Sequence, residues 1–411
     1  MRVEPSLSGS LPAVDKALRK VTETLARELA DPTATAPDWS PFEWDLARAA
    51  ASIHGVSALL CTRLRWKGPA KWTEFLADQA HQTRSRHTRF VELLALFDTE
   101  AKRSGLALLA LKGAALHAAG LYAPGERPMA DIDLLAPEAD RQAAHQLLAK
   151  LGFALAEVSW KHEEFEPTQR IATAALGESA ANPMKIELHW RIKEKLPQRL
   201  VDVSAQIFWK QPQAGLTYYP SRAAAMTHLL LHAGGAIASK TIRLLHLHDI
   251  ARLSGTMSES DWLEVAAPPA PASTPWWAFP AVALTARYFD GIPEPVVQRL
   301  RSACPVVLRR LSERRALCDV SLSHMWVSMF PGIEWATSLR EAVHFAAVRI
   351  LPDKEAAQQR HNTMRSQVDV TETGWTRLSQ ARRIMLWLRA PSRMPRPPTL
   401  LAVRAALNDP S

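Results

Sequence analysis

The sequence predicts an α+β protein in which a small mixed sheet lies between two helical regions. Apolar residues recur with helical spacing before residue 100 and again after about residue 208. Between residues 105 and 192 the pattern changes to short apolar or alternating runs bounded by glycine, proline and polar residues, which is typical of strands. We therefore divide the chain into an N-terminal helical region (1–100), a core region (101–200) and a C-terminal helical region (201–411).

The composition is that of a globular protein with a basic excess. The 411 residues carry a formal net charge of +9 and are 47% hydrophobic, which is enough to form a sizeable core. No run of about 18 apolar residues occurs, so we expect no membrane span. The start of the chain lacks a signal pattern, and the three cysteines are too widely spaced for a disulfide framework or a zinc knuckle. These features predict a cytoplasmic protein.

The N-terminal region is predicted to contain three helices, over residues 11–29, 44–65 and 70–102. A proline-rich connector at 31–41 separates the first two helices. The third helix carries a basic stretch, which we interpret as a solvent-exposed face. Its members are Arg84, Arg86, His87 and Arg89.

The core region alternates predicted strands and helices. The helices cover residues 114–121 and 137–151, and the second begins with proline and acidic residues. The strands are predicted from apolar or alternating runs at 106–111, 131–136, 153–160 and 184–192, with a further candidate at 171–176.

The C-terminal region is predicted to be helical and to end in a basic segment. The segment from Arg377 to Arg404 holds seven arginines and no acid, so it is either a solvated tail or a patch for nucleic acid. A proline- and alanine-rich linker covers 266–275. Helices are predicted at 222–233, 240–253, 276–289, 295–301, 306–317, 339–351 and 377–388.

Three carboxylates in the core region point to metal chemistry. Asp131 and Asp133 are two residues apart in a predicted strand, so their side chains point to the same face. Glu187 lies in another strand. Carboxylate oxygens are preferred ligands of Mg²⁺, and such a set can hold two cations for nucleotidyl transfer. The alternative is a pair of solvated acids in a turn.

Four further residues in this region suit the phosphates of a nucleotide. Gly113 lies between a strand and a helix, where backbone N–H groups can approach phosphate. Lys112 supplies a point charge, and Arg127 is a second basic candidate. His189 shares a strand face with Glu187 and is a candidate for contact with metal or phosphate.

These motifs resemble those of an uncharacterised bacterial nucleotidyltransferase family in the DNA polymerase β-like superfamily. The resemblance covers about residues 105–192 and extends to an Asp-containing helix at 244–250. It implies a polymerase β-like nucleotidyltransferase core, metal binding by Asp131, Asp133 and Glu187, and Gly113 in the phosphate-facing turn. The residues that carry it are Leu111-Lys112-Gly113-Ala114-Ala115-Leu116, Tyr122, Arg127, Asp131-Ile132-Asp133-Leu134-Leu135 and Glu187-Leu188-His189-Trp190.

Ala114 departs from the pattern of the wider superfamily, in which a serine follows the glycine of the phosphate turn. It motivates an alternative in which the chain is a catalytically degenerate nucleotide-binding or scaffolding protein of a biosynthetic gene cluster. His228 and His232 share a helix face and suit either a metal site or a helix packed near the active-site cleft. Asp249 is interpreted as a partner of the substrate or of a nearby arginine such as Arg243 or Arg252.

We therefore predict a metal-dependent enzyme that transfers a nucleoside monophosphate from a nucleoside triphosphate to an unknown acceptor. The acceptor classes left open are a small molecule, a saccharide and a peptide or protein. Mg²⁺ or Mn²⁺ is the predicted cofactor, held by the catalytic carboxylates of Asp131, Asp133 and Glu187. The residues predicted to contact the nucleotide are Lys112, Gly113, Arg127 and His189.

Overall fold

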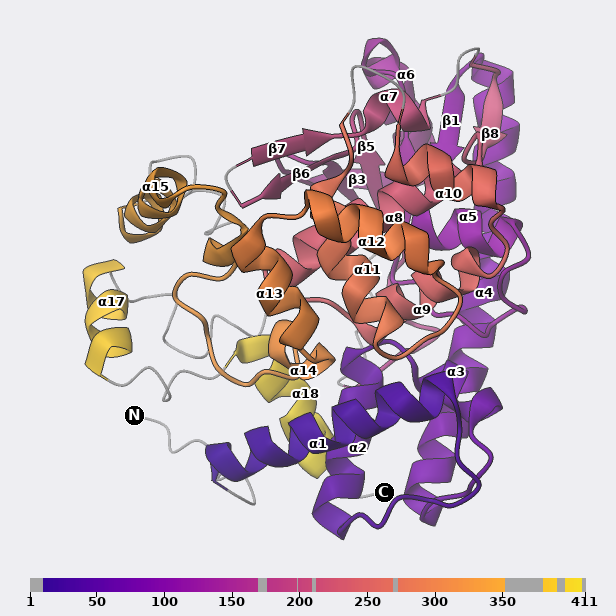
Figure 1. The fold of residues 1–411 in the computed structure, drawn as a ribbon. Helices are drawn as coiled ribbons and strands as arrows, with labels where there is room; N and C mark the ends of the chain where they lie inside the picture. The colour runs from indigo at the N-terminus through magenta and orange to yellow at the C-terminus, as the bar shows by residue number, and fades with distance from the viewer. Residues whose placement is uncertain are drawn as a thin grey trace.

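A computed structural model describes residues 10–168, 176–197, 199–208, 212–268, 273–351, 380–389 and 396–408. Within these residues the chain forms a mixed α+β structure, as predicted. The sheet lies at the upper right in Figure 1, the first three helices lie at the bottom, and the C-terminal helices fill the space between. No helix of the described part is long and apolar enough to cross a membrane.

The N-terminal region contains four helices where three were predicted. Gly55 divides the second one, because its φ of +66° is incompatible with a continuous helix. Gly105 ends the long fourth helix in the same left-handed conformation, at φ +69°. The four helices are α1 (Leu11–Ala30), α2 (Pro41–Ile53), α3 (Ser57–Arg63) and α4 (Ala70–Ser104).

The sheet has six strands in the order β3-β4-β5-β2-β1-β8, and a separate hairpin pairs β6 with β7. Strands β2 and β5 are parallel, as are β1 and β8, whereas the other neighbours are antiparallel. The predicted mixed sheet is thus confirmed. The strands are β1 (Ala107–Ala110), β2 (Asp131–Leu135), β3 (Phe153–Val158), β4 (Glu163–Pro167), β5 (Lys185–His189), β6 (Lys193–Leu196), β7 (Arg199–Asp202) and β8 (Gly215–Thr217).

Four strands escaped prediction because they are short or highly charged. Strand β4 reads Glu-Glu-Phe-Glu-Pro, and β6, β7 and β8 have only three or four residues each. Their backbone pairing depends on neighbouring strands rather than on their own propensity. Of the candidate strand at 171–176, only Leu176 belongs to the described residues, and it lies outside any strand.

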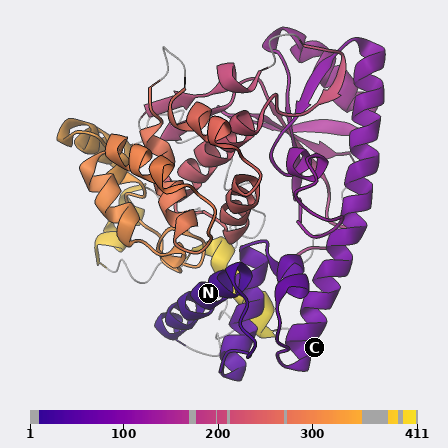
Figure 2. The same ribbon diagram turned by 45° about the vertical axis from the view of Figure 1, so that its right-hand side comes forward.

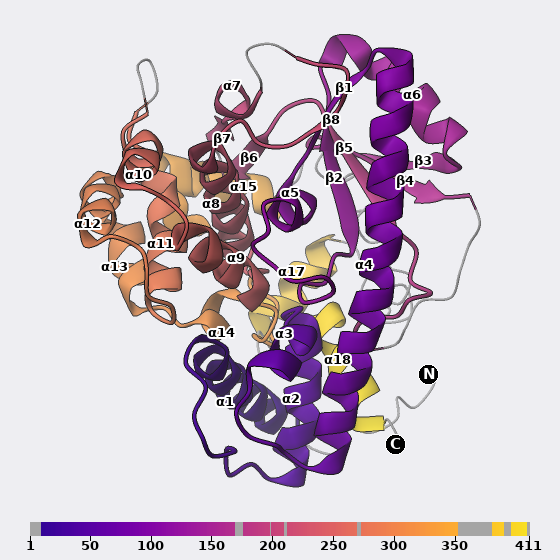
Figure 3. The same cartoon turned by 90° about the vertical axis from the view of Figure 1, so that its right-hand side faces the viewer.

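The two faces of the sheet differ in polarity because side chains alternate along each strand. One face is apolar: Ile132, Leu134, Ile186 and Leu188 pack in a core with Phe97 of α4. Helices α4 and α6 (Arg141–Lys150) cover this face, as Figure 3 shows. The opposite face looks towards α5 (Lys112–Ala118) and α8 (Arg222–Ala238), and it carries the polar residues described below.

The remaining helices connect or follow the strands, and four of the α-helices, α7, α10, α14 and α18, were not predicted. The 3₁₀ helices are η1 (Glu138–Asp140), η2 (Trp276–Ala278) and η3 (Ile333–Trp335). The α-helices are α7 (Ser204–Ile207), α9 (Leu244–Ser254), α10 (Glu259–Ala266), α11 (Phe279–Ala286), α12 (Glu294–Ala303), α13 (Val306–Arg314), α14 (Leu317–Val320), α15 (Leu339–Ile350), α17 (Gln380–Arg389) and α18 (Pro397–Asn408).

The first and last helices of the chain share one hydrophobic core. Helix α18 packs on α2, with Leu400, Val403 and Ala406 buried between them. The buried guanidinium of Arg48 donates from Nη2 to the carbonyl oxygen of Ala406 at 2.6 Å. The C-terminal helices therefore complete the N-terminal region in space, as Figure 2 shows at its base. The boundaries at residues 100 and 200 stay a prediction.

Loss of the α18 contact is expected to destabilise the whole protein. Leu400→Ala should lower the free energy of unfolding by about 2–4 kcal/mol, because it leaves a cavity between α18 and α2. Thermal and urea unfolding measure this change. The matched control is Leu388→Ala on α17, where the side chain is 66% exposed and the loss should stay within about 0.5 kcal/mol. Equal effects of the two variants would contradict the shared core.

Candidate functional site

The parallel pairing of β2 with β5 brings the predicted acids together. Asp133 and Glu187 are register partners on adjacent strands. Asp131 precedes Asp133 by two residues, and His189 follows Glu187 by two, so all four side chains lie on the same face of the sheet. Two carboxylates from one strand and one from its neighbour thus stand side by side.

Lys112 is the counter-charge of this cluster. Its Nζ lies 2.6 Å from Oδ1 of Asp133 and 3.8 Å from Oε2 of Glu187. Lys112 lies at the junction of β1 and α5. Its φ is +43°, which is a left-handed conformation that is unfavourable for lysine. Its backbone N–H donates to the hydroxyl of Tyr219 at 3.0 Å. Lys112 is therefore held towards the acids by its own backbone geometry.

The hydroxyl that holds Lys112 is itself fixed by His228. Tyr219 Oη lies 2.7 Å from His228 Nδ1, and since it accepts from Lys112, its own hydrogen is directed to the ring nitrogen. Burial lowers the pKa of His228 well below its usual range, so the ring is neutral and able to accept. His228 thus serves the site through a structural hydrogen bond.

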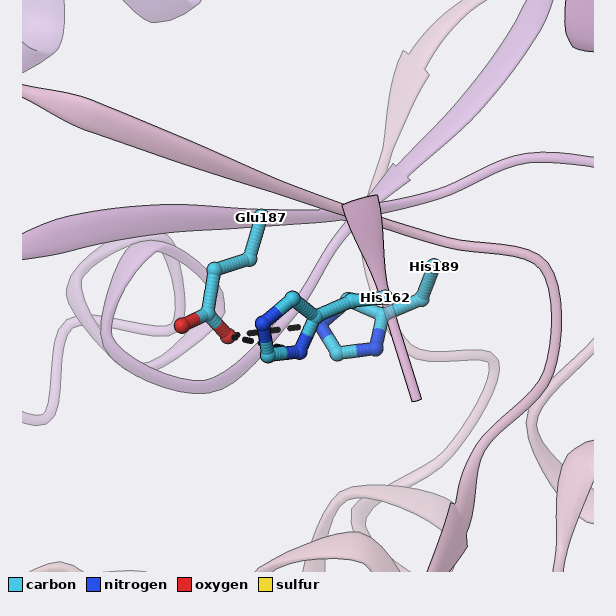
Figure 4. A group of neighbouring side chains, drawn as sticks. All are labelled: His162, Glu187 and His189. Carbon is cyan, nitrogen blue, oxygen red and sulfur yellow. Dashed lines mark ion pairs between the residues drawn. The ribbon is translucent and has the colours of Figure 1, made fainter. Parts of the chain in front are cut away.

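Two histidines surround Glu187 on the same face. His189 Nε2 lies 3.1 Å from Oδ1 of Asp133 and 3.6 Å from Oε2 of Glu187. His162 lies just before β4 and places Nδ1 3.5 Å from the same Glu187 oxygen. Figure 4 shows both rings directed at the Glu187 carboxylate. The ligand atoms of these three residues lie within 4.8 Å of one another, and burial lowers the pKa of His162 to about 4, which keeps it neutral.

The carboxylates of the cluster differ in ionisation. Burial and the charges of Glu187 and Asp133 raise the pKa of Asp131 to about 7. Burial also opposes ionisation of Asp133, but Lys112 and His189 outweigh it and hold the pKa of Asp133 well below its usual range. Among the described residues, no side chain forms an ion pair or hydrogen bond with the Asp131 carboxylate. The cluster is thus short of positive charge at Asp131.

Arg127 and Asp249 form a buried pair behind Gly113. Arg127 donates from Nε and Nη2 to the two carboxylate oxygens of Asp249, at 2.8 and 2.7 Å, and Tyr122 donates to Oδ1 at 2.7 Å. A Cβ on Gly113 would lie 2.4 Å from Nη1 of Arg127, so the guanidinium requires glycine there. The partner of Asp249 is thus Arg127 rather than the suggested Arg243 or Arg252.

This pairing leaves little of Arg127 for a ligand. Its Nη1 donates to the carbonyl oxygen of Pro128 at 3.1 Å. Arg127 is nevertheless among the residues that line the cleft. The positive φ at the predicted phosphate turn belongs to Lys112 and not to Gly113. The phosphate-binding roles of Gly113 and Arg127 stay predictions.

The interpretation of the basic stretch on α4 as a solvent-exposed face is wrong for Arg86. This side chain is buried and donates to the carbonyl oxygens of Met129 at 3.0 Å and Asn182 at 2.7 Å. Its Nε also lies 3.0 Å from Oε2 of Glu178. Arg86 therefore fixes the backbone directly before Asp131. The helical pattern could not reveal this, because the loops that cover Arg86 come from distant parts of the sequence.

A cleft of about 640 Å³ runs along the polar face of the sheet. Lys112, Asp131, Asp133 and Glu187 line one side of it. The C-terminal helices α8 and α9 and the turn between them line the other side. Their polar lining residues are His232, Thr241, Arg243, His246 and Asp249, and their apolar ones are Leu229, Ala236 and Leu245. A cavity of this size is in the range of ligand-binding pockets, roughly 300–1,000 Å³.

A family model described as an uncharacterised nucleotidyltransferase matches residues 40–290, which is more than half of the chain. The chain belongs to this family. No curated protein and no solved structure matches it significantly. The match to the nucleotidyltransferase family contains every predicted site residue and the cleft walls formed by α8 and α9. Bacterial origin and membership of the polymerase β-like superfamily stay predictions.

The raised pKa of Asp131 predicts how the folding stability of this protein depends on pH. In the unfolded chain the carboxyl titrates near 3.8 and in the folded protein near 7. The folded state therefore binds the extra proton, and the stability contributed by Asp131 is lost as pH rises from about 4 to 7. Without metal, Asp131→Asn should have a higher free energy of unfolding than the wild type at pH 8, by up to about 4 kcal/mol, and the gain should vanish near pH 4.

Thermal unfolding across pH with a chelator present measures this difference. Glu157→Gln is the matched control, since Glu157 is a partly buried strand carboxylate outside the residues that line the cleft. A destabilised or pH-independent Asp131→Asn variant would contradict the crowding of charge at Asp131.

Proposed function

We propose that this protein transfers a nucleoside monophosphate from a nucleoside triphosphate to an acceptor hydroxyl. The observation that carries the proposal is the cluster of Asp131, Asp133 and Glu187 on adjacent parallel strands at the floor of the cleft. Such a cluster is costly to folding, because three carboxylates repel one another in a buried site. Its cost is explained if the site binds cations and phosphate.

The side chains of the cluster fit a divalent cation. Asp131, Asp133 and Glu187 offer hard oxygen ligands, which suit Mg²⁺ and Mn²⁺, and the Asp131 carboxylate is without a partner among the described residues. His162 adds a nitrogen ligand beside Glu187, and nitrogen suits Mn²⁺ better than Mg²⁺. Bound cations would neutralise the phosphates and promote ionisation of the acceptor hydroxyl.

Lys112 and His189 position the acids for this role. The hydrogen bond from His189 Nε2 to Oδ1 orients the Asp133 carboxylate. The ammonium of Lys112 contacts the same oxygen, and its high pKa beside these acids keeps it charged. On nucleotide binding we expect Lys112, which lines the cleft, to contact a phosphate oxygen as well, because its ammonium has three donors.

The proposed reaction is an in-line displacement at the α-phosphorus. The acceptor oxygen forms a bond to phosphorus, the bond to the bridging oxygen of the β-phosphate breaks, and pyrophosphate leaves with the bond electrons. The acceptor proton is released to solvent. The chain contributes mainly positioning and electrostatic stabilisation to this reaction.

The alanine at position 114, in place of the serine of the wider superfamily, has a structural explanation. It is therefore no argument against catalysis. Ala114 is 2% exposed and packs with Met129 and Ile132 in the apolar core. It is absent from the residues that line the cleft. A serine here would place its hydroxyl in the core, so the alanine is favoured by packing whether or not the enzyme is active.

The arginine-rich segment supports nucleic-acid binding less well than the cleft supports a nucleotide. Arg396 is largely buried and donates to the carbonyl oxygens of Lys240 and Ser321 at 2.6 and 3.0 Å. Part of the segment is thus used in packing, and Arg377 and Arg393 lie outside the described residues.

The proposal predicts metal-dependent labelling of an acceptor. A panel of α-³²P-labelled nucleoside triphosphates with Mg²⁺ or Mn²⁺ should give labelled product and pyrophosphate, and a chelator should abolish both. Asp133→Asn and Glu187→Gln should each lower the rate by about 100-fold or more, because each removes charge that the transition state requires. Glu157→Gln should retain the wild-type rate.

The outcomes separate the candidate functions. Metal-dependent nucleotide binding without turnover, lost in Asp133→Asn, would indicate a nucleotide sensor or scaffold rather than an enzyme. Absence of nucleotide binding by a folded wild-type protein would exclude both.

A further inference from the structure

Arg243 lines the cleft with a guanidinium that has no partner in the described part of the chain. The residue is exposed and directly precedes α9. No ion pair or hydrogen bond joins its guanidinium to another described residue. Its charge nevertheless acts on the carboxylate cluster: burial, Glu187 and Asp133 raise the pKa of Asp131, and Lys112 and Arg243 oppose that rise. A positive charge with free donors thus lies within electrostatic reach of the proposed metal site.

The other basic side chains of the cleft already have partners. Among the described residues that line the cleft there are four more lysine and arginine side chains. Lys112 and Arg127 contact the acids described above. Lys161 forms an ion pair with β6, and Arg396 donates to backbone carbonyl oxygens. Arg243 is therefore the basic side chain whose donors are most available to an anion that enters the cleft.

The backbone next to Arg243 is fixed by the N-terminal region. His54 directly follows α2, and its Nδ1 accepts from the N–H of Leu244 at 2.9 Å, while its carbonyl oxygen accepts from Leu245 at 3.3 Å. Burial lowers the pKa of His54 to about 3, so the ring is neutral. Its Nε2 therefore carries the hydrogen and donates it to Oγ of Ser323 at 2.8 Å. The start of α9 is thus held in place while the guanidinium of Arg243 stays unbound.

The chemistry of the proposed site requires such a cation. Divalent cations held by three carboxylates share most of their charge with those acids. Negative charge builds up on the outer phosphates of a nucleoside triphosphate as their bond to the α-phosphate breaks. A guanidinium matches these phosphates, because its planar fork of donors binds two oxygens at once. Arg127, which the motif predicted for a phosphate, uses its fork for Asp249 instead.

We propose that Arg243 binds the β- and γ-phosphates of the nucleotide and stabilises the pyrophosphate as it leaves. The carboxylates and their cations hold the α-phosphate from the sheet, and Arg243 holds the outer phosphates from the start of α9. The C-terminal helical region thus supplies a binding residue as well as a wall of the cleft. This inference rests on the proposed nucleotidyl transfer and adds to it the residue that recognises the leaving group.

Binding of pyrophosphate tests the inference without knowledge of the acceptor. The probes are pyrophosphate with Mg²⁺, whichever of ATP, GTP, CTP and UTP binds, and the matching nucleoside monophosphate, each measured by isothermal titration calorimetry. Arg243→Gln should raise the Kd of pyrophosphate and of the triphosphate about 10- to 100-fold, because charged hydrogen bonds are lost. The Kd of the monophosphate should stay unchanged. Arg243→Lys keeps the charge without the fork and should raise the first two Kd values about three- to tenfold.

Arg222→Gln is the matched control, because it removes the same charge from an exposed arginine at the start of α8, outside the residues that line the cleft. It should leave all three Kd values unaltered. Both glutamine variants should unfold at the wild-type temperature, since neither guanidinium bonds to another described residue.

The outcomes separate the inference from the proposed function. If Arg243→Gln binds the triphosphate and pyrophosphate as the wild type does, or weakens the monophosphate equally, the role of Arg243 is wrong while the nucleotide site stands. If the folded wild-type protein binds no nucleotide, the proposed function fails first and the inference falls with it.

Discussion

The parallel pairing of β2 with β5 is the constraint on which the site depends. It places Asp133 beside Glu187 on the neighbouring strand. Asp131 lies two residues before Asp133, so the three acids share one face of the sheet. Lys112 provides the nearby positive charge, at 2.6 Å from Asp133, while the pKa of Asp131 rises to about 7. The apolar core on the opposite face of the same strands stabilises a pairing that the repulsion between the acids would otherwise disfavour.

Much of the surrounding structure serves to hold that arrangement in place. Arg86 fixes the backbone before Asp131, the Tyr219–His228 pair fixes Lys112, and the Arg127–Asp249 pair packs behind Gly113. These contacts join the core region to α4, α8 and α9. The helical regions on either side of the sheet therefore determine the geometry of the carboxylates as well as the walls of the cleft.

The sequence predicted what depends on local pattern. The α+β class, the strand that carries Asp131 and Asp133 and the strand that carries Glu187 followed from alternation and from a motif. His162, Arg86 and Tyr219 were missed, because each reaches the site through a contact between distant segments. Arg127 was identified as important from its position in the motif, but its buried pairing with Asp249 depends on the packing of α9. Ala114 raised a question that only its burial answers.

The most direct test of the central claim is a count of bound Mn²⁺ by electron paramagnetic resonance, with a non-hydrolysable nucleoside triphosphate analogue present. The account predicts tight Mn²⁺ binding that needs the nucleotide for its full extent, approaches about two ions per chain and is lost in Asp133→Asn. Glu157→Gln should bind as the wild type does. Mn²⁺ binding that is absent from the folded wild-type protein, or that is unchanged by Asp133→Asn, would contradict the assignment of the three carboxylates as a metal site.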